Sequence, residues 1–577
     1  MVLRESSSRS FLPSLRLRGE FPLVCFLPHG LLALYLRFLF ARLPMFGHAV
    51  VRGRRCDLHD ELIAKRAGGR RDMRSINKAD SARIMCLSLF LVCSFVSAYA
   101  QDGPSSESQP IASIESPDAG TIYKVPGVPD AAQPSSATGP ELSGNFFQRL
   151  GGYYKADWTG KLPSSSTPRR VLDAPLDSPP FPSSEWGYGG SSPIGVSDGG
   201  VYPLMTALGK QNSRTKVYGW IAASVNGSTS SKSNFPLSYD VYPNSVVLNQ
   251  AVIYLERLPN TVQSERHFEW GYHLTAFYGN DYRFTTAKDY LSQQLLQKNR
   301  RYGFDPVLEY LDLYFPVKEG LNIRFGRFLS VPGIEAQLAP NNYNMSHSLL
   351  YTIDPFTDTG AIASLKLTKQ WMVQLGISAG HDVAPWSDDA KASAIACLNY
   401  STKTNYDNFY ICANGINDGK YAYNNLQHYD ATWYHKFNAK WHMATEAWYM
   451  YERDVPNVAG NVENPVPTEI GANGAFCAPG KLTCTAPEYA IVNYVNREFN
   501  PHLFVGFRSD VLNDQKGQRT GIPGKYTENT LYATKYFGST ILVRPEIRFD
   551  HSWDRPGYNL GTARNQFFFG VDMIYKF

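Results

Sequence analysis

From residue 214 to the C-terminus, apolar and polar residues alternate in segments of about ten residues. The last segment ends in FFFGVDMIYKF, in which Phe569, Val571, Met573, Tyr575 and Phe577 occupy every second position. Successive side chains of a strand point to opposite faces, so these five residues share one face. The same spacing predicts fourteen strands, at residues 214–225, 246–257, 267–279, 306–317, 321–329, 359–368, 371–381, 426–437, 441–453, 488–499, 502–510, 526–537, 540–550 and 566–577.

The clearest strand, 540–550, has four charged residues on one face and apolar residues on the other. A charge on the lipid face of a membrane strand costs about 2–4 kcal/mol near the midplane, so the charged row must face inward. We therefore predict an inner, pore-lining row that comprises Glu269, His273, Arg324, Glu446, Arg508, Asp510, Arg544, Glu546, Arg548 and Asp550.

The connections between the segments alternate in length along the whole series. Long ones fall near residues 226–245, 280–304, 329–358, 382–424, 454–487, 510–524 and 551–564, and short ones lie between them. Short turns on one side and long loops on the other are typical of outer-membrane barrels, whereas a soluble sandwich has no reason to sort its loops. The predicted fold is all-β, a transmembrane antiparallel up-and-down β-barrel of about 14 strands (12–16), preceded by a disordered Pro/Ser/Gly-rich segment.

The first part of the chain has a different composition. Residues 1–100 hold 16 of the 56 Lys and Arg and 7 of the 51 Asp and Glu, which leaves 40 basic and 44 acidic residues from residue 101 on. A slightly acidic chain has no electrostatic motive to bind nucleic acid. A basic stretch after Met73, an apolar run and Ala98-Tyr99-Ala100 predict a signal peptide at 73–100. Residues 1–72 are then a non-native or mis-started leader, 101–212 a periplasmic linker and 213–577 the barrel.

Four cysteines remain after the predicted signal peptide. Cys397 and Cys412 form one near pair, and Cys477 and Cys484 form the other. Neither pair has CxxC spacing, and an exported protein favours disulfides over zinc. We predict two local disulfides, both in long external loops, with free thiols as the alternative.

Several phrases occur together in a recognisable order: FEWGYHLTAFYGNDYRFTT, LNIRFGRFLSVPGIE, SHSLLYTIDPFTDTGA and LVRPEIRFDHS. Over about residues 215–577 the sequence resembles the OmpL-like β-barrel porins of Gram-negative outer membranes. The resemblance implies a barrel and a pore but no transport specificity. The row Phe569, Val571, Met573, Tyr575 and Phe577 also resembles the signal that the barrel-insertion machinery reads.

Two functions remain open. The first is a porin that passes small hydrophilic solutes through a polar, mixed-charge lumen, as a monomer or small homo-oligomer in outer-membrane lipid. Sign alternation in segment 540–550 predicts weak charge selectivity. The second is a plugged or closed barrel whose disulfide-pinned loops bind an external ligand or surface, as an adhesin or receptor.

An enzyme is not expected, because the sequence lacks the common nucleophile, zinc and phosphate motifs. His347 lies between Ser346 and Ser348, but such a tripeptide in a loop is ordinary polar loop chemistry without a located acid partner. No cofactor and no metal are expected. The same charged row has a further reading, in which it braces the inner wall instead of contacting solutes.

Overall fold

The computed structural model divides into two units, 1–101 and 102–577, and everything described here belongs to the second. The described residues are 143–162, 170–171, 196–197, 202–211, 213–261, 266–296, 301–330, 333–404, 406–420, 425–438, 440–458, 474–500 and 502–577. The predicted leader and signal peptide lie outside these residues, as does much of the predicted linker.

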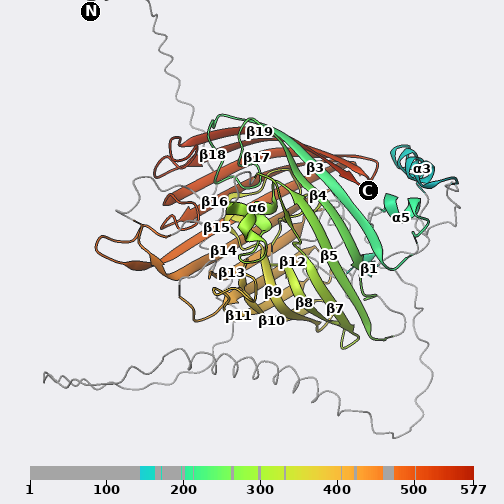
Figure 1. Cartoon of the computed structure of the whole chain (residues 1–577), viewed down its shortest axis with the longest axis horizontal. Helices are drawn as coiled ribbons and strands as arrows, with labels where there is room; N and C mark the ends of the chain where they lie inside the picture. Colours follow the sequence, from blue (N-terminus) through green and yellow to red (C-terminus); the bar gives the residue numbers. More distant parts are fainter. Residues whose placement is uncertain are drawn as a thin grey trace, which may run out of the picture. The chain divides into compact units, whose positions relative to one another are not determined.

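The described part of the second unit is dominated by strands that form one closed barrel (Figure 1). The barrel strands are β3 (Lys216–Ser228), β4 (Val246–Arg257), β5 (Glu269–Gly279), β6 (Gly303–Asp305), β7 (Glu309–Phe315), β8 (Leu321–Leu329), β9 (Thr357–Lys366), β10 (Trp371–His381), β11 (Ser393–Ser401), β12 (Asp407–Ile416), β13 (Gln427–Lys436), β14 (Trp441–Pro456), β15 (Thr483–Asn500), β16 (Leu503–Asp514), β17 (Gly524–Phe537), β18 (Ile541–Ser552) and β19 (Asn565–Lys576).

Each barrel strand pairs antiparallel with its neighbours in the chain, and β19 pairs with β3 to close the ring. Figure 1 shows this seam, where the red β19 lies beside the green β3. At the seam, backbone hydrogen bonds join Gly219 and Phe577 in both directions (3.0 and 2.9 Å). Both β6 and β7 pair with β5, so they share one place in the wall and the described barrel has sixteen strands.

The predicted fold class is confirmed, and the strand number is sixteen instead of about fourteen. The two additional strands, β11 and β12, lie in the region 382–424, so the prediction of one long loop there is wrong. Their period-two pattern is weak because apolar residues occupy both faces. In β11, Ile395 and Cys397 are buried, while Ala396 and Leu398 alternate with them on the exposed face.

Shorter turns and longer loops alternate around the barrel as the sequence predicts, except that the turn 258–268 is longer than the loops 417–426 and 515–523. The short turns lie at 258–268, 316–320, 367–370, 402–406, 437–440, 501–502 and 538–540, on the side of the C-terminus. The long loops lie at 229–245, 280–308, 330–356, 382–392, 417–426, 457–482, 515–523 and 553–564, on the other side. They contain α6 (Tyr282–Thr285), η1 (Ser292–Leu296), η2 (Ala339–Asn341) and α7 (Leu349–Ile353).

Two helices precede the barrel, α3 (Phe146–Trp158) and α5 (Pro203–Ala207), with a two-residue pairing of β1 (Arg170–Val171) and β2 (Val196–Ser197). Asn145 precedes α3 and forms a capping box with Gln148. The Asn145 side chain accepts from the backbone N–H of Gln148, and the Gln148 side chain accepts from the backbone N–H of Asn145. Asp157 accepts hydrogen bonds from Ser539 and Thr540 in the turn between β17 and β18. The helix α3 therefore docks on the rim of the barrel.

Across the part of the chain that is described, no helix is both long enough and apolar enough to cross a bilayer.

Candidate functional site

The loop 330–356 between β8 and β9 folds into the barrel. Its apolar side chains join two buried clusters with the inner walls: Ala336 and Leu338 pack in the cluster of Trp220, and Leu349 packs in the cluster of Trp448. A solvated external loop would not carry this many large apolar residues, because their burial is what stabilises them. We call residues 330–356 the inner loop.

Local hydrogen bonds give the inner loop a fixed shape. The Asn342 side chain accepts from Ala336 N (2.7 Å) and donates to Ala336 O (2.9 Å), which holds a tight bend. Ser348 caps α7 by accepting from Tyr351 N (3.0 Å). These side chains satisfy backbone groups that would otherwise be buried without a partner.

The inner loop spans the lumen from one wall to the other. Gln250 of β4 accepts from Ala339 N (3.0 Å), and Glu446 of β14 accepts from Ile334 N (2.7 Å). In the barrel order β4 and β14 stand seven places apart among sixteen, so the two anchors lie on nearly opposite walls. The loop therefore crosses the lumen between these two walls.

Three arginines on β16 and β18 hold the middle of the inner loop. Each forms an ion pair with an acid on the inner wall: Arg508 with Glu528 (3.1 Å), Arg544 with Asp572 (3.0 Å) and Arg548 with Asp550 (2.8 Å). Each also donates to a carbonyl of the loop: Arg508 to Ser346 (2.6 Å), Arg544 to Ala339 (2.8 Å) and Asn342 (3.0 Å), and Arg548 to His347 (2.5 Å). We call this face of β16–β18 the arginine wall.

The acids of the arginine wall bind the loop as well. Glu546 accepts from the Asn344 side chain (2.8 Å) and from Ser346 N (3.0 Å), and Asp510 accepts from Leu349 N (2.8 Å). Hydrogen bonds to charged groups are about twice as strong as neutral ones. The arginine wall is thus a dense set of charge-assisted contacts to one loop.

All ten residues predicted for the inner row lie on the inner face of the barrel, and each is at most 9% exposed. Those on β16 and β18 contact the inner loop, except Asp550, which accepts from Arg548 and Gln566, and Glu446 contacts the loop from β14. Three others form contacts on β5 and β8: Glu269 with Arg214 (2.9 Å), His273 with Glu256 (3.0 Å) and Arg324 with Asp312 (2.9 Å). The reading in which the charged row braces the wall therefore fits the contacts of the arginine wall.

His347 is enclosed in the inner loop. Its ring stacks on Tyr239 (4.1 Å between ring centroids) and Tyr351 (4.6 Å), and Nε2 donates to Ala336 O (2.8 Å). Burial lowers the pKa of His347 to about 3, so the ring is neutral at physiological pH. Its neighbour Ser348 donates to Glu335. These contacts give His347 a structural place in the loop.

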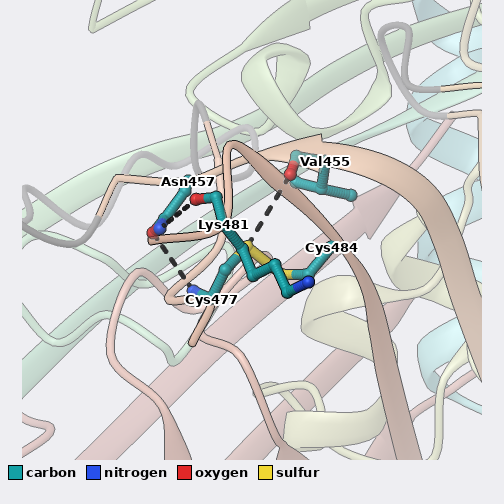
Figure 2. The surroundings of a disulfide bond; sticks show 5 residues. All are labelled: Val455, Asn457, Cys477, Lys481 and Cys484. Atoms are coloured by element: carbon teal, nitrogen blue, oxygen red, sulfur yellow. Dashed lines mark hydrogen bonds between the residues drawn. A yellow bond between two sulfur atoms is a disulfide. The ribbon is translucent and has the colours of Figure 1, made fainter. Parts of the chain in front are cut away.

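Both predicted disulfides are present. Cys397 on β11 and Cys412 on β12 are direct cross-strand partners, so the prediction that this bridge lies in an external loop is wrong. Cys477, in the loop between β14 and β15, is bonded to Cys484 at the start of β15 (Figure 2). There Asn457 accepts from Cys477 N (3.2 Å) and donates to Lys481 O (2.7 Å), which ties the two sides of the loop together.

The outward row of β19 is exposed on the outer wall. Phe569 and Met573 are among the exposed apolar residues, while Asp572 and Ile574 on either side of Met573 are buried. An exposed belt of this kind surrounds the barrel and includes Trp270, Leu274, Leu531 and Ile547. Such a surface is suited to lipid, because a water-facing wall would not expose so many large apolar side chains.

Sequence reasoning missed the inward course of the inner loop and the arginine contacts to its carbonyls. A signal was available, because residues 334–353 contain Ile334, Leu338, Leu349, Leu350 and Ile353 within a connection that should be solvated. The contacts themselves leave no trace in the sequence, because backbone carbonyls accept irrespective of residue type.

A sixteen-strand barrel with an apolar outer belt and a loop folded across its lumen is a porin-type barrel. Residues 214–577 match the family described as putative beta-barrel porin-2, OmpL-like, and the chain belongs to this family. The resemblance of the four quoted phrases is thereby confirmed.

Solved structures with a similar fold include the anion-selective porin from Comamonas acidovorans and the outer membrane channel DcaP of Acinetobacter baumannii. The first is 9% identical, with 63% of this chain and 99% of that chain covered and a TM-score of 0.41. The second is 9% identical, with 63% and 97% covered and a TM-score of 0.41. Among curated proteins no sequence matches.

Proposed function

We propose that the protein is an outer-membrane porin in which small hydrophilic solutes diffuse passively past the inner loop. The observation that carries the proposal is a sixteen-strand barrel whose lumen is crossed by one loop that is bonded to the walls. Barrels of 16–18 strands are wide enough to leave an aqueous channel, so the loop and not the wall sets the passage. No catalytic step is part of this function.

The proposal includes the cellular route of the protein. The signal peptide at 73–100 would direct export, and the barrel-insertion machinery would read the terminal row from Phe569 to Phe577. The outer belt of apolar residues supports contact with outer-membrane lipid. The assembly is a monomer or small homo-oligomer.

Single-channel conductance of the purified full chain in planar bilayers tests the proposal. We expect steady, small conductance, and a several-fold increase after residues 334–348 are replaced by a short Gly-Ser linker, because the arginines then face water. The control replaces residues 383–391, in the external loop between β10 and β11, by the same linker and should leave the conductance unchanged. Heat-dependent migration in detergent gels checks that each variant is folded.

A second function has one specific observation in its favour. The strands β14 and β15 have 16 and 18 residues, and their hairpin is pinned at its top by the Cys477–Cys484 disulfide. A rigid projecting hairpin suits a closed barrel that binds an external ligand or surface. Silence in bilayers for the wild type and for the loop replacement would favour this function over the porin.

A further inference from the structure

The inner faces of β13 and β14 carry a polar cluster that meets the inner loop, and β15 alone separates it from β16 of the arginine wall. His428, Asp430 and Thr432 lie on β13, and Glu446 and Trp448 lie on β14. Asp430 is the cross-strand partner of Trp448, and Thr432 is the partner of Glu446. Each of the five side chains is at most 3% exposed. We call this set the acidic wall.

Asp354, at the end of the inner loop, completes the cluster. Its carboxylate lies 3.5 Å from Nε2 of His428. Arg519 approaches from the loop 515–523, and its guanidinium donates to Ile353 O (3.2 and 3.0 Å). Three carboxylates, those of Asp354, Asp430 and Glu446, therefore meet at this wall with Arg519 beside them.

Polar atoms of the acidic wall lack hydrogen-bond partners among the described residues. They are both carboxylate oxygens of Asp430, one oxygen each of Glu446 and Asp354, the hydroxyl of Thr432 and the indole nitrogen of Trp448. A buried polar group without a partner is costly, so such groups are satisfied by water or by a ligand when the protein does not supply one. The indole nitrogen of Trp448 and the hydroxyl of Thr432 indicate contact with water independently of the carboxylates.

The inner loop makes fewer hydrogen bonds to the acidic wall than to the arginine wall, and its further contacts there are the packing of Leu349 with Trp448 and the approach of Asp354 to His428. Near the acidic wall, Glu446 accepts from Ile334 N (2.7 Å), and Tyr434 donates to Gly333 O (3.4 Å). Both contacts lie at the first residues of the loop, whereas the three arginines donate to carbonyls along its middle. The hydrogen bonds that hold the middle of the loop therefore come from the arginine wall and not from β13 and β14.

We propose that solutes pass between the inner loop and the acidic wall, and that Asp430 and Glu446 make this path selective for monovalent cations, including organic ammonium ions. The inference rests on the proposed porin function and names its substrate class. It replaces the prediction of weak charge selectivity with a preference for cations over anions. The three arginines of the arginine wall do not balance the acids of the path, because each is already bonded to a carboxylate and to a loop carbonyl. Arg519 lies at the end of the loop, where it donates to Ile353 O.

The chemistry of the acidic wall fits mobile cations better than a bound metal ion. In the described ranges, no group of three His, Cys, Asp or Glu residues has the geometry of a metal site. A hydrated or organic cation needs only nearby negative charge, and the face of Trp448 adds a cation–π contact.

The reversal potential in a KCl gradient across a planar bilayer tests the inference. Wild type, the double variant Asp430→Asn with Glu446→Gln, and the control Asp388→Asn are compared as full chains. Asp388 lies exposed in the external loop 382–392, so its variant removes one charge far from the lumen. We expect a K⁺ over Cl⁻ permeability ratio above one in the wild type and in the control. The double variant should lower that ratio by about threefold or more, since a unit charge near a permeating ion changes its local concentration by such a factor.

A second measurement locates the path without relying on the charges. Thr432→Cys should lose current when a cationic, membrane-impermeant thiol reagent is added. Thr530→Cys, on the arginine wall, should keep its current, because the Thr530 hydroxyl is bonded to Arg508 and Glu528, whereas the Thr432 hydroxyl has no partner among the described residues. Wild-type protein treated with the same reagent controls for its own cysteines.

The outcomes separate the two proposals. Conduction with an unchanged ratio in the double variant, or loss of current in Thr530→Cys but not in Thr432→Cys, would overturn the cation path and leave the porin standing. Silence in every variant, the loop replacement included, would overturn the porin itself.

Discussion

Two walls of the barrel face the same inner loop, and both are charged, yet they differ in how their charges are used. On the arginine wall, Arg508, Arg544 and Arg548 each have a carboxylate and a loop carbonyl as partners. On the acidic wall, Asp430 has no hydrogen-bond partner among the described residues for either oxygen. The comparison teaches that charges on an inner face stabilise the barrel when they are paired with other protein groups. Charges without such partners are available to attract solutes.

The largest expected effect comes from breaking the arginine wall. Arg508→Met leaves Glu528 buried without its partner, so the free energy of unfolding should fall by about 3–5 kcal/mol. Urea unfolding in detergent micelles, followed by tryptophan fluorescence, measures the change. The control is Arg214→Met, because Arg214 also pairs with an acid, Glu269, but its side chain is 47% exposed. That variant should cost less than about 1 kcal/mol. Equal effects in the two variants would remove the distinction between the arginine wall and an ordinary surface pair.

A smaller effect, of opposite sign on the two walls, is expected from removing one carboxylate charge. Asp430→Asn should raise the free energy of unfolding by about 1 kcal/mol, because an unpartnered buried charge is replaced by a neutral amide. Asp550→Asn should lower it by about 2 kcal/mol, because Arg548 loses its charged partner. The same unfolding measurement serves both variants. A loss of stability in Asp430→Asn would mean that the acidic wall holds the loop as firmly as the arginine wall does.

The smallest effect is expected at the rim, outside both walls. Asp157 of α3 accepts from the backbone of Ser539 (2.8 Å) and Thr540 (3.1 Å) and from both of their hydroxyls (2.6 Å each). Asp157→Asn should weaken the docking of α3 by about 1–2 kcal/mol and leave conductance unchanged. Limited proteolysis of the segment before the barrel measures the docking, with exposed Lys155→Ala as the matched control on the same helix. A rise in conductance would show that the segment obstructs the lumen.

Period-two alternation and the parity of loop lengths predict most of the fold. In β18 and β19 buried residues alternate with more exposed ones, and the charged residues of β18 fall on its buried row. The strands β11 and β12 escape the pattern because apolar residues occupy both of their faces. The spacing of Cys397 and Cys412 in the sequence predicts the disulfide between them. It does not predict that the disulfide joins two strands of the barrel wall.

The sequence by itself determined that charged residues such as Arg544 and Asp550 face inward, because the face of a strand residue depends only on its position along that strand. Only the tertiary structure decided that the inner loop crosses the lumen and which charges it neutralises. Arg508 and the carbonyl of Ser346 are 162 residues apart, and a backbone carbonyl has no side-chain signature. The alternation of side chains along one strand determines which face each of them occupies. The burial of a charge depends instead on distant segments that the closed barrel brings together.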